Sequence, residues 1–211
     1  MMIRLTAVGA CALLTLAACG RDDRPAAGAP ATEAPAAMTP AVEAPAATPA
    51  ADPNILTAEG LGAARIGMSK ADLIAAWGDR ANLNAVGGAE PEVCDQFHPA
   101  RAPQGVNVMI QDGKLTRITL MRDARIKTDR GFGLGDTAMA VKQAYGGSIF
   151  AEPHKYQAAP AEDLFAWSKG GSTNYVTDPS ARGVRYEIGT DGKVMAIHAG
   201  GPSIQLVEGC S

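Results

Sequence analysis

The sequence lacks long hydrophobic runs, is poor in aromatic residues and carries no excess of positive charge. No apolar stretch reaches the roughly 18 residues that a membrane-spanning helix needs, so we expect no mature transmembrane segment. Lysine and arginine number 19 against 22 aspartate and glutamate, a formal net charge of −3 over 211 residues. Since proteins that bind nucleic-acid phosphates are normally basic, we also expect no nucleic-acid partner.

Sequence motifs of enzyme and metal sites are missing as well. There is no P-loop, no Gly-x-Ser-x-Gly elbow and no His-Glu-x-x-His. His98, His154 and His198 do not have metal-site spacing, so we expect no enzyme activity, no metal and no cofactor. His198 falls in an alternating segment, which predicts an exposed or half-buried position on a strand.

The first residues have the features of a bacterial export signal. Arg4 precedes an almost wholly apolar run from Leu5 to Ala18, followed by Cys19. Residues 16–19, Leu-Ala-Ala-Cys, resemble the lipobox of bacterial lipoproteins. That resemblance implies a signal peptide at 1–18, acyl chains on Cys19 that insert into membrane lipid, and, from Gly20, an outer-membrane address facing the periplasm. A plain secretory signal cleaved nearby is the alternative.

A tether is expected over residues 19–53. Positions 20–53 hold 13 alanines and 7 prolines, and the regularly spaced prolines interrupt any helix that the alanines begin. The segment has no large apolar side chain with which to build a core, so we expect a disordered, partly extended linker. At about 3.1 Å per residue it reaches at most about 100 Å. A binding role for the linker is the alternative.

A short helix is predicted twice in the remaining chain, at a spacing of 68 residues. Segment 65–78 is echoed by segment 133–146, and in each a Ser or Thr can cap the helix start while a Gly can end it. Apolar residues four apart place one apolar side on each helix. The matched pairs are Gly67 with Gly135, Ser69 with Thr137, Leu73 with Val141, Trp77 with Tyr145 and Gly78 with Gly146.

A β-hairpin with an Asp-Gly turn is also predicted twice. Strands 106–111 and 114–120 flank the first turn, and strands 184–188 and 193–198 flank the second. We therefore expect one α+β domain over 54–211. It would hold two tandem units, 54–125 and 126–211, each a short helix or helix pair packed on antiparallel sheet.

This organisation resembles two related families. Residues 66–69, Ile-Gly-Met-Ser, with Leu73 and Gly78 resemble the helix opening of the SmpA/OmlA-type lipoproteins of outer-membrane assembly. The tandem arrangement resembles the β-lactamase-inhibitory-protein-like fold, in which two helix-plus-sheet units lie side by side. The resemblances imply a non-enzymatic module for envelope assembly or inhibition that binds a periplasmic or outer-membrane protein.

Two of the four cysteines are expected to form a disulfide. Cys11 leaves with the signal and Cys19 is acylated, which leaves Cys94 and Cys210 in an oxidising compartment. A redox pair or a metal site is the alternative, but the chain has no Cys-x-x-Cys to support it.

Alternation along the strands predicts a binding surface. Because successive strand residues point to opposite faces, we expect one set in the core and the other facing solvent. A mixture of methionine, amide and charge suits a protein interface. The expected core residues are Val106, Val108, Ile110, Val184, Tyr186 and Ile188. The expected surface residues are Asn107, Met109, Gln111, Arg185 and Glu187.

A basic segment lies at the junction between the two units. It holds Arg117, Arg122, Arg125, Lys127 and Arg130 against Asp123 and Asp129. The segment is expected to be an ordinary solvated stretch; contact with lipopolysaccharide, peptidoglycan or an acidic protein face is the alternative.

The sequence favours a non-enzymatic, lipid-anchored periplasmic protein that binds another protein. A cell-envelope enzyme with a cryptic site and a structural spacer that contacts peptidoglycan are the alternatives. A pocket that gathers His98, His154 and carboxylates would favour the enzyme, whereas a broad face with exposed aromatic side chains would favour binding.

Overall fold

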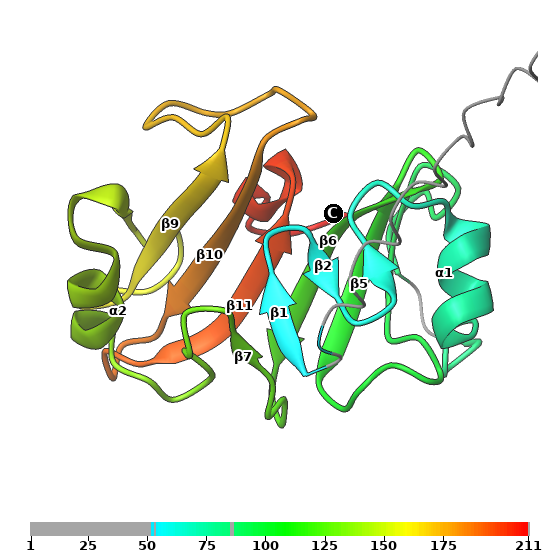
Figure 1. Ribbon diagram of the computed structural model, residues 1–211, viewed down its shortest axis with the longest axis horizontal. Helices are drawn as coiled ribbons and strands as arrows, with labels where there is room; N and C mark the ends of the chain where they lie inside the picture. Colours follow the sequence, from blue (N-terminus) through cyan, green and yellow to red (C-terminus); the bar gives the residue numbers. More distant parts are fainter. Residues whose placement is uncertain (1–51, 53, 85–86, 211) are drawn as a thin grey trace, which may run out of the picture. The chain divides into compact units, whose positions relative to one another are not determined.

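The computed structural model describes residues 52, 54–84 and 87–210, all within one compact unit of the chain (Figure 1). The expected signal peptide at 1–18, the acylated Cys19 and the tether up to residue 51 lie outside the described residues. Within the described part, no helix is long and apolar enough to cross a membrane.

A seven-stranded antiparallel sheet forms the main layer. Its strand order is β4-β5-β6-β11-β10-β9-β8, so two meanders meet where β6 pairs with β11. Thr119 and His198 face each other across this central pair. The strands are β4 (Cys94–Phe97), β5 (Val106–Gln111), β6 (Lys114–Met121), β8 (Phe150–Pro153), β9 (Glu162–Lys169), β10 (Arg182–Ile188) and β11 (Val194–Gly200).

A small second sheet and two α-helices cover one face of the main sheet. Figure 1 shows α1 and α2 toward opposite ends of the large sheet, with the small sheet between them. Apolar side chains from all of these elements join one core. The helices are α1 (Lys70–Trp77) and α2 (Ala138–Tyr145), and the small sheet contains β1 (Ile55–Thr57), β2 (Gly60–Leu61), β3 (Ala64–Arg65) and β7 (Lys127–Thr128). Two 3₁₀ turns complete the list, η1 (Gly146–Ser148) and η2 (Pro202–Gln205).

The helices begin and end where the sequence predicts. The Ser69 hydroxyl accepts a hydrogen bond from the Asp72 N–H at 3.1 Å, and the Thr137 hydroxyl accepts one from the Ala140 N–H at 3.2 Å. Each side chain satisfies an N–H group that has no partner inside its helix. Gly78 follows α1 with a φ of 81°, which favours glycine.

The two helix starts attach to the two Asp-Gly hairpins through the same set of backbone hydrogen bonds. Before α1, the N–H of Gly67 donates to the Leu115 carbonyl at 2.7 Å, and the Leu115 N–H donates to the Met68 carbonyl at 2.9 Å. Before α2, the corresponding bonds join Gly135 to Val194 at 2.9 Å and Val194 to Asp136 at 2.8 Å. The structure is thus α+β. The equivalent backbone bonds before α1 and α2 occur where the sequence repeats its helix caps and Asp-Gly turns.

Candidate functional site

The core assignment from strand alternation is confirmed. Val106, Val108, Ile110, Val184, Tyr186 and Ile188 all lie in the core beneath the helices. The alternate residues lie on the other face of the seven-stranded sheet, which we call the open face. Its side chains include Gln96, Asn107, Met109, Arg117, Thr119, Phe150, Asp163, Phe165, Trp167, Arg185, Glu187 and His198.

Part of the surface assignment is wrong, because two of the five expected surface residues are buried. Met109 and Arg185 are each only 1% exposed, whereas Gln111 and Glu187 are half-buried. Residues 201–210 leave β11 and return over the open face, a long-range packing that strand alternation cannot reveal. Gln111 lines a separate depression near the first hairpin turn.

The disulfide between Cys94 and Cys210 is present, as the sequence predicts, with a Cα–Cα distance of 5.4 Å. It attaches the end of the chain to β4. The Arg117 guanidinium holds the same returning segment, donating to the carbonyls of Ser203 at 3.0 Å and Leu206 at 2.8 Å. The C-terminal segment is therefore a fixed part of the open face.

A buried polar cluster lies at the centre of the open face. Arg185 Nη2 donates to Glu187 Oε2 at 3.2 Å and lies 3.1 Å from His198 Nε2, which is itself 3.0 Å from the same carboxylate oxygen. His154 Nε2 donates to the other Glu187 oxygen at 3.2 Å, since its Nδ1 accepts the backbone N–H groups of two following residues. Asp163 Oδ1 lies 3.5 Å from Arg185 Nε. His198 is thus buried, contrary to the exposed or half-buried position expected from the sequence.

The environment of this cluster changes its pKa values. Burial, and then the charge of Arg185, lower the pKa of His198 to about 3. The hydrogen bond from His198 outweighs burial and lowers the pKa of Glu187 to about 2, whereas burial raises the pKa of Asp163. At neutral pH the cluster therefore contains a neutral His198 beside a charged Glu187 and Arg185.

The free energy of unfolding should fall as the pH is lowered from about 6.5 to about 3. Over that range His198 takes up a proton in the unfolded chain but not in the folded one, which disfavours folding by an amount on the order of 5 kcal/mol. Glu187 adds a further loss from its ordinary value of 4.5 down to about 2, where the folded carboxylate is finally protonated. Urea unfolding at a series of pH values measures this slope.

In His198→Gln, the free energy of unfolding should depend less steeply on pH above pH 4.5. His98→Gln is the matched control, because His98 lies outside the cluster, with Nδ1 at 2.6 Å from the Val106 carbonyl. An unchanged slope in the His198 variant would locate the proton uptake elsewhere.

Thr119, His198 and Glu187 are arranged as a hydroxyl, an imidazole and a carboxylate in line. Thr119 Oγ1 is 3.1 Å from His198 Nδ1, and Glu187 lies at the other ring nitrogen. A catalytic triad needs an imidazole that accepts the hydroxyl proton. The depressed pKa of His198 and the nearby Arg185 guanidinium oppose that transfer, so we interpret the arrangement as structural. The structure does not place His98 with His154 and the carboxylates.

Towards the β8 edge the open face is aromatic. Phe165 lies between Phe150 and Trp167, at ring-centre distances of 6.4 and 6.5 Å, and the rings of Phe165 and Trp167 are nearly parallel. The segment 170–181 folds over them and is held by the Gln205 side chain, which bonds both the N–H and the carbonyl of Val176. This close approach requires glycine at 171, since a Cβ there would lie 2.0 Å from the Trp167 side chain.

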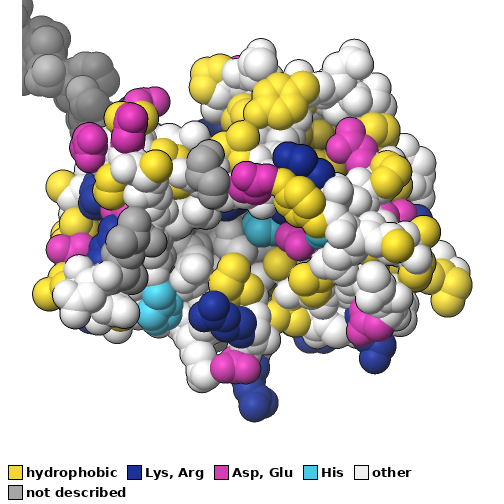
Figure 2. Space-filling view, turned by 180° about the vertical axis from the view of Figure 1, so that it is seen from behind, with side chains coloured by type: hydrophobic (Ala, Val, Ile, Leu, Met, Phe, Trp, Pro, Cys, Tyr) yellow, Lys and Arg dark blue, Asp and Glu magenta, His cyan; other side chains and the backbone are white. Residues whose placement is uncertain are grey.

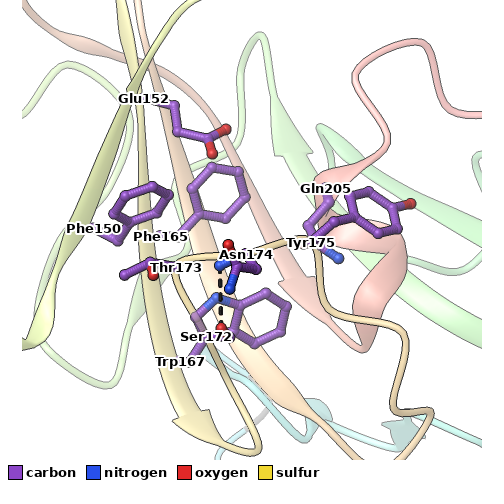
Figure 3. A pocket seen from close by; sticks show the side chains of 9 residues that line it. All are labelled: Phe150, Glu152, Phe165, Trp167, Ser172, Thr173, Asn174, Tyr175 and Gln205. Atoms are coloured by element: carbon purple, nitrogen blue, oxygen red, sulfur yellow. Dashed lines mark hydrogen bonds between the residues drawn. The ribbon is translucent and has the colours of Figure 1, made fainter.

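These elements enclose a pocket of about 90 Å³. Figure 3 shows Phe150, Phe165 and Trp167 around it, with Tyr175 and Gln205 on the opposite side and the polar residues 172–174 between them. Tyr175 is 65% exposed at the rim. The pocket is smaller than the roughly 300 Å³ at which small-molecule sites begin, and it suits a single side chain of a larger partner.

The aromatic pocket was missed by the sequence analysis, which did not predict β8 and β9. The one local signal is the alternation of Leu164, Phe165, Ala166 and Trp167, followed by two glycines. Phe150 comes from a separate strand and could not be added from spacing. In the described residues, no group of three or more His, Cys, Asp or Glu side chains is arranged to hold a metal ion.

Comparisons with protein-family models, with curated proteins and with solved structures found no match. The resemblance to SmpA/OmlA-type lipoproteins and to the β-lactamase-inhibitory-protein-like fold stays a prediction.

Proposed function

We propose that this chain is a non-enzymatic lipoprotein, anchored in the bacterial outer membrane through acylated Cys19 and facing the periplasm. Its folded domain binds another envelope protein through the open face. The lipobox-like residues 16–19 and the Ala/Pro-rich segment support the anchor and the tether.

The aromatic pocket is the observation that carries the binding role. Protein interfaces are rich in aromatic side chains, and their binding energy is concentrated where an anchor side chain fills a dry pocket. Phe150, Phe165, Trp167 and Tyr175 supply the aromatic part of the pocket, and Tyr175 is exposed, whereas Glu152, Gln205 and residues 172–174 supply its polar part. A side chain of the partner would enter between these rings, while the half-buried Glu187 contributes a polar contact toward the middle of the same face. Gln111 lies farther away, on β5.

We further propose that the domain arose by duplication of a helix-then-hairpin unit. The matched caps, the matched Asp-Gly turns and the equivalent backbone bonds support this origin. In the central strand pair, Thr119 faces His198, which is the residue at the same place in the second hairpin. An open face built from both units offers a partner a continuous surface across the junction.

Partner capture from detergent-solubilised envelope tests the binding role. Tyr175→Ala and the pocket-filling Thr173→Trp should each lose a partner that the parent chain retains. Met139→Ala is the matched control, because Met139 is 66% exposed on α2, which covers the other face. If both pocket variants retain the partner as well as the control does, the pocket is not the binding site.

The anchor is tested by Cys19→Ala. This change should abolish metabolic labelling with a radioactive fatty acid and release the protein from the membrane fraction, because acyl chains supply the membrane affinity. Membrane retention without any label would contradict the anchor.

A further inference from the structure

A hollow of about 370 Å³ lies on the open face beside the buried polar cluster. It is lined by residues of β4, β5, β6, β10 and β11 and by residues 207–209 of the returning C-terminal segment. Figure 2, which views the domain from behind, shows imidazole groups inside a hollow with charged side chains around it. The volume lies in the range of sites that hold a small ligand or a single charged group.

Arg117 lines the hollow as a buried cation whose direct partners are all neutral. It is 4% exposed, and besides the two carbonyls of the C-terminal segment it donates to the Gln96 amide oxygen at 2.7 Å. Buried charges are normally paired with an opposite charge. Burial, and then repulsion from Arg185, lower the pKa of Arg117 to about 10, against the opposing effect of the Glu187 charge.

The other polar groups of the hollow include donors with no strong acceptor, whereas both of its carboxylates are already engaged. Arg122 is exposed at the end of β6 and makes no hydrogen bond or ion pair with the described residues. Asn107 donates only to the Met121 sulfur, at 3.7 Å. The Glu187 oxygens are engaged by Arg185 and both histidines, and Glu208 pairs with Lys155 at 3.5 Å. A ligand for this site must therefore accept hydrogen bonds.

From these contacts, we propose that the hollow binds a carboxylate group between Arg117, Arg122 and Asn107. The planar guanidinium of Arg122 can donate two parallel hydrogen bonds to a carboxylate. A phosphate dianion fits less well, because Glu187 and Glu208 line the same hollow. Of the basic segment, Arg117 and Arg122 line this hollow, whereas Arg125 lines a different depression.

Our inference about which molecule carries the carboxylate rests on the proposed function. In a protein-binding domain the group is an acidic side chain of the partner, which enters the hollow while another of its side chains enters the aromatic pocket. A free organic acid is the other source of the same chemistry, and two probes separate the two sources.

The test is a titration of the isotope-labelled full chain, followed by NMR of the side-chain N–H groups. The probes are sodium acetate, the blocked tripeptide N-acetyl-Ala-Glu-Ala-amide with its Gln analogue, and inorganic phosphate, all at constant ionic strength adjusted with NaCl. Acetate and the Glu peptide should give saturable shifts at Gln96, Asn107 and Arg122, and phosphate should bind more weakly.

Arg122→Gln should weaken both carboxylates by about tenfold or more, since it removes a charged hydrogen-bond donor. Arg125→Gln, an exposed arginine outside the hollow, should leave both affinities unchanged. If both variants lose the same carboxylate affinity, or if chloride alone produces the same NMR shifts, the effect is general charge screening and the proposed site is wrong. An absence of saturable shifts with both acids overturns it too.

The relative affinities assign the source. Tighter binding of the Glu peptide than of acetate, with no binding of its Gln analogue, assigns the group to a protein partner, whereas tighter binding of acetate assigns a free acid. Failure of partner capture with intact acetate binding would contradict the proposed function and leave the carboxylate site standing. If Arg122→Gln still captures the partner and the parent chain does not bind acetate, the carboxylate site is contradicted and the proposed function stands.

Discussion

Replacing Arg185 with methionine is expected to destabilise the domain by about 3–5 kcal/mol, because removing one member of a buried ionic cluster leaves the other charges unpaired. Asp163, which is itself buried, loses its nearest cation, and Glu187 loses one of its donors. Charge reversal, Arg185→Glu, should destabilise the domain further, because three carboxylates would then lie together. Urea unfolding at neutral pH measures both effects.

Arg125→Met is the control for this prediction, since Arg125 is exposed and such substitutions usually change stability by less than about 0.5 kcal/mol. An Arg185 variant as stable as the parent would mean that the guanidinium is solvated and that the cluster is not a folding determinant.

Loss of the Cys94–Cys210 bridge is expected to cost up to about 5 kcal/mol, because the bridge closes a long loop in the unfolded chain. The two residues are 116 positions apart. Reduction, or the double change Cys94→Ser with Cys210→Ser, should lower the melting temperature while the far-ultraviolet circular dichroism stays unchanged. The C-terminal segment keeps its Arg117 contacts but loses its covalent attachment to β4.

A count of free thiols tests whether the Cys94–Cys210 disulfide is formed. The mature domain isolated without reductant should show no free thiol at Cys94 or Cys210. Two titratable thiols in protein taken from the periplasm would contradict the bridge.

The features that the sequence predicted well are set by local signals. Ser69 and Thr137 cap their helices because the N–H groups they satisfy lie three residues away. The Asp-Gly turns fix the hairpins, and period-two alternation separates Val106 and Val184 from their neighbours on the open face. Each of these signals lies within a few residues of the structure it determines.

The features that the sequence did not predict depend on contacts between distant segments. Met109 and Arg185 look outward from their strands. Met109, however, lies beside Arg117, which binds the returning C-terminal segment, and Arg185 lies inside a charge cluster drawn from three strands. His198 is buried because Arg185 and Glu187 enclose it. No spacing rule relates these residues, since their contacts are set by the order β6-β11-β10-β9 in the sheet.

The central claim, that the open face of the domain holds a protein partner, is tested most directly by site-specific photo-crosslinking in intact bacteria. A photoreactive phenylalanine derivative would replace Tyr175 on the open face in one chain and Met139 on α2 in another, both well exposed. The account predicts one discrete crosslinked species from position 175, reduced by Thr173→Trp, and none from position 139. A crosslink from position 139 alone, or the same products from both positions, would contradict it.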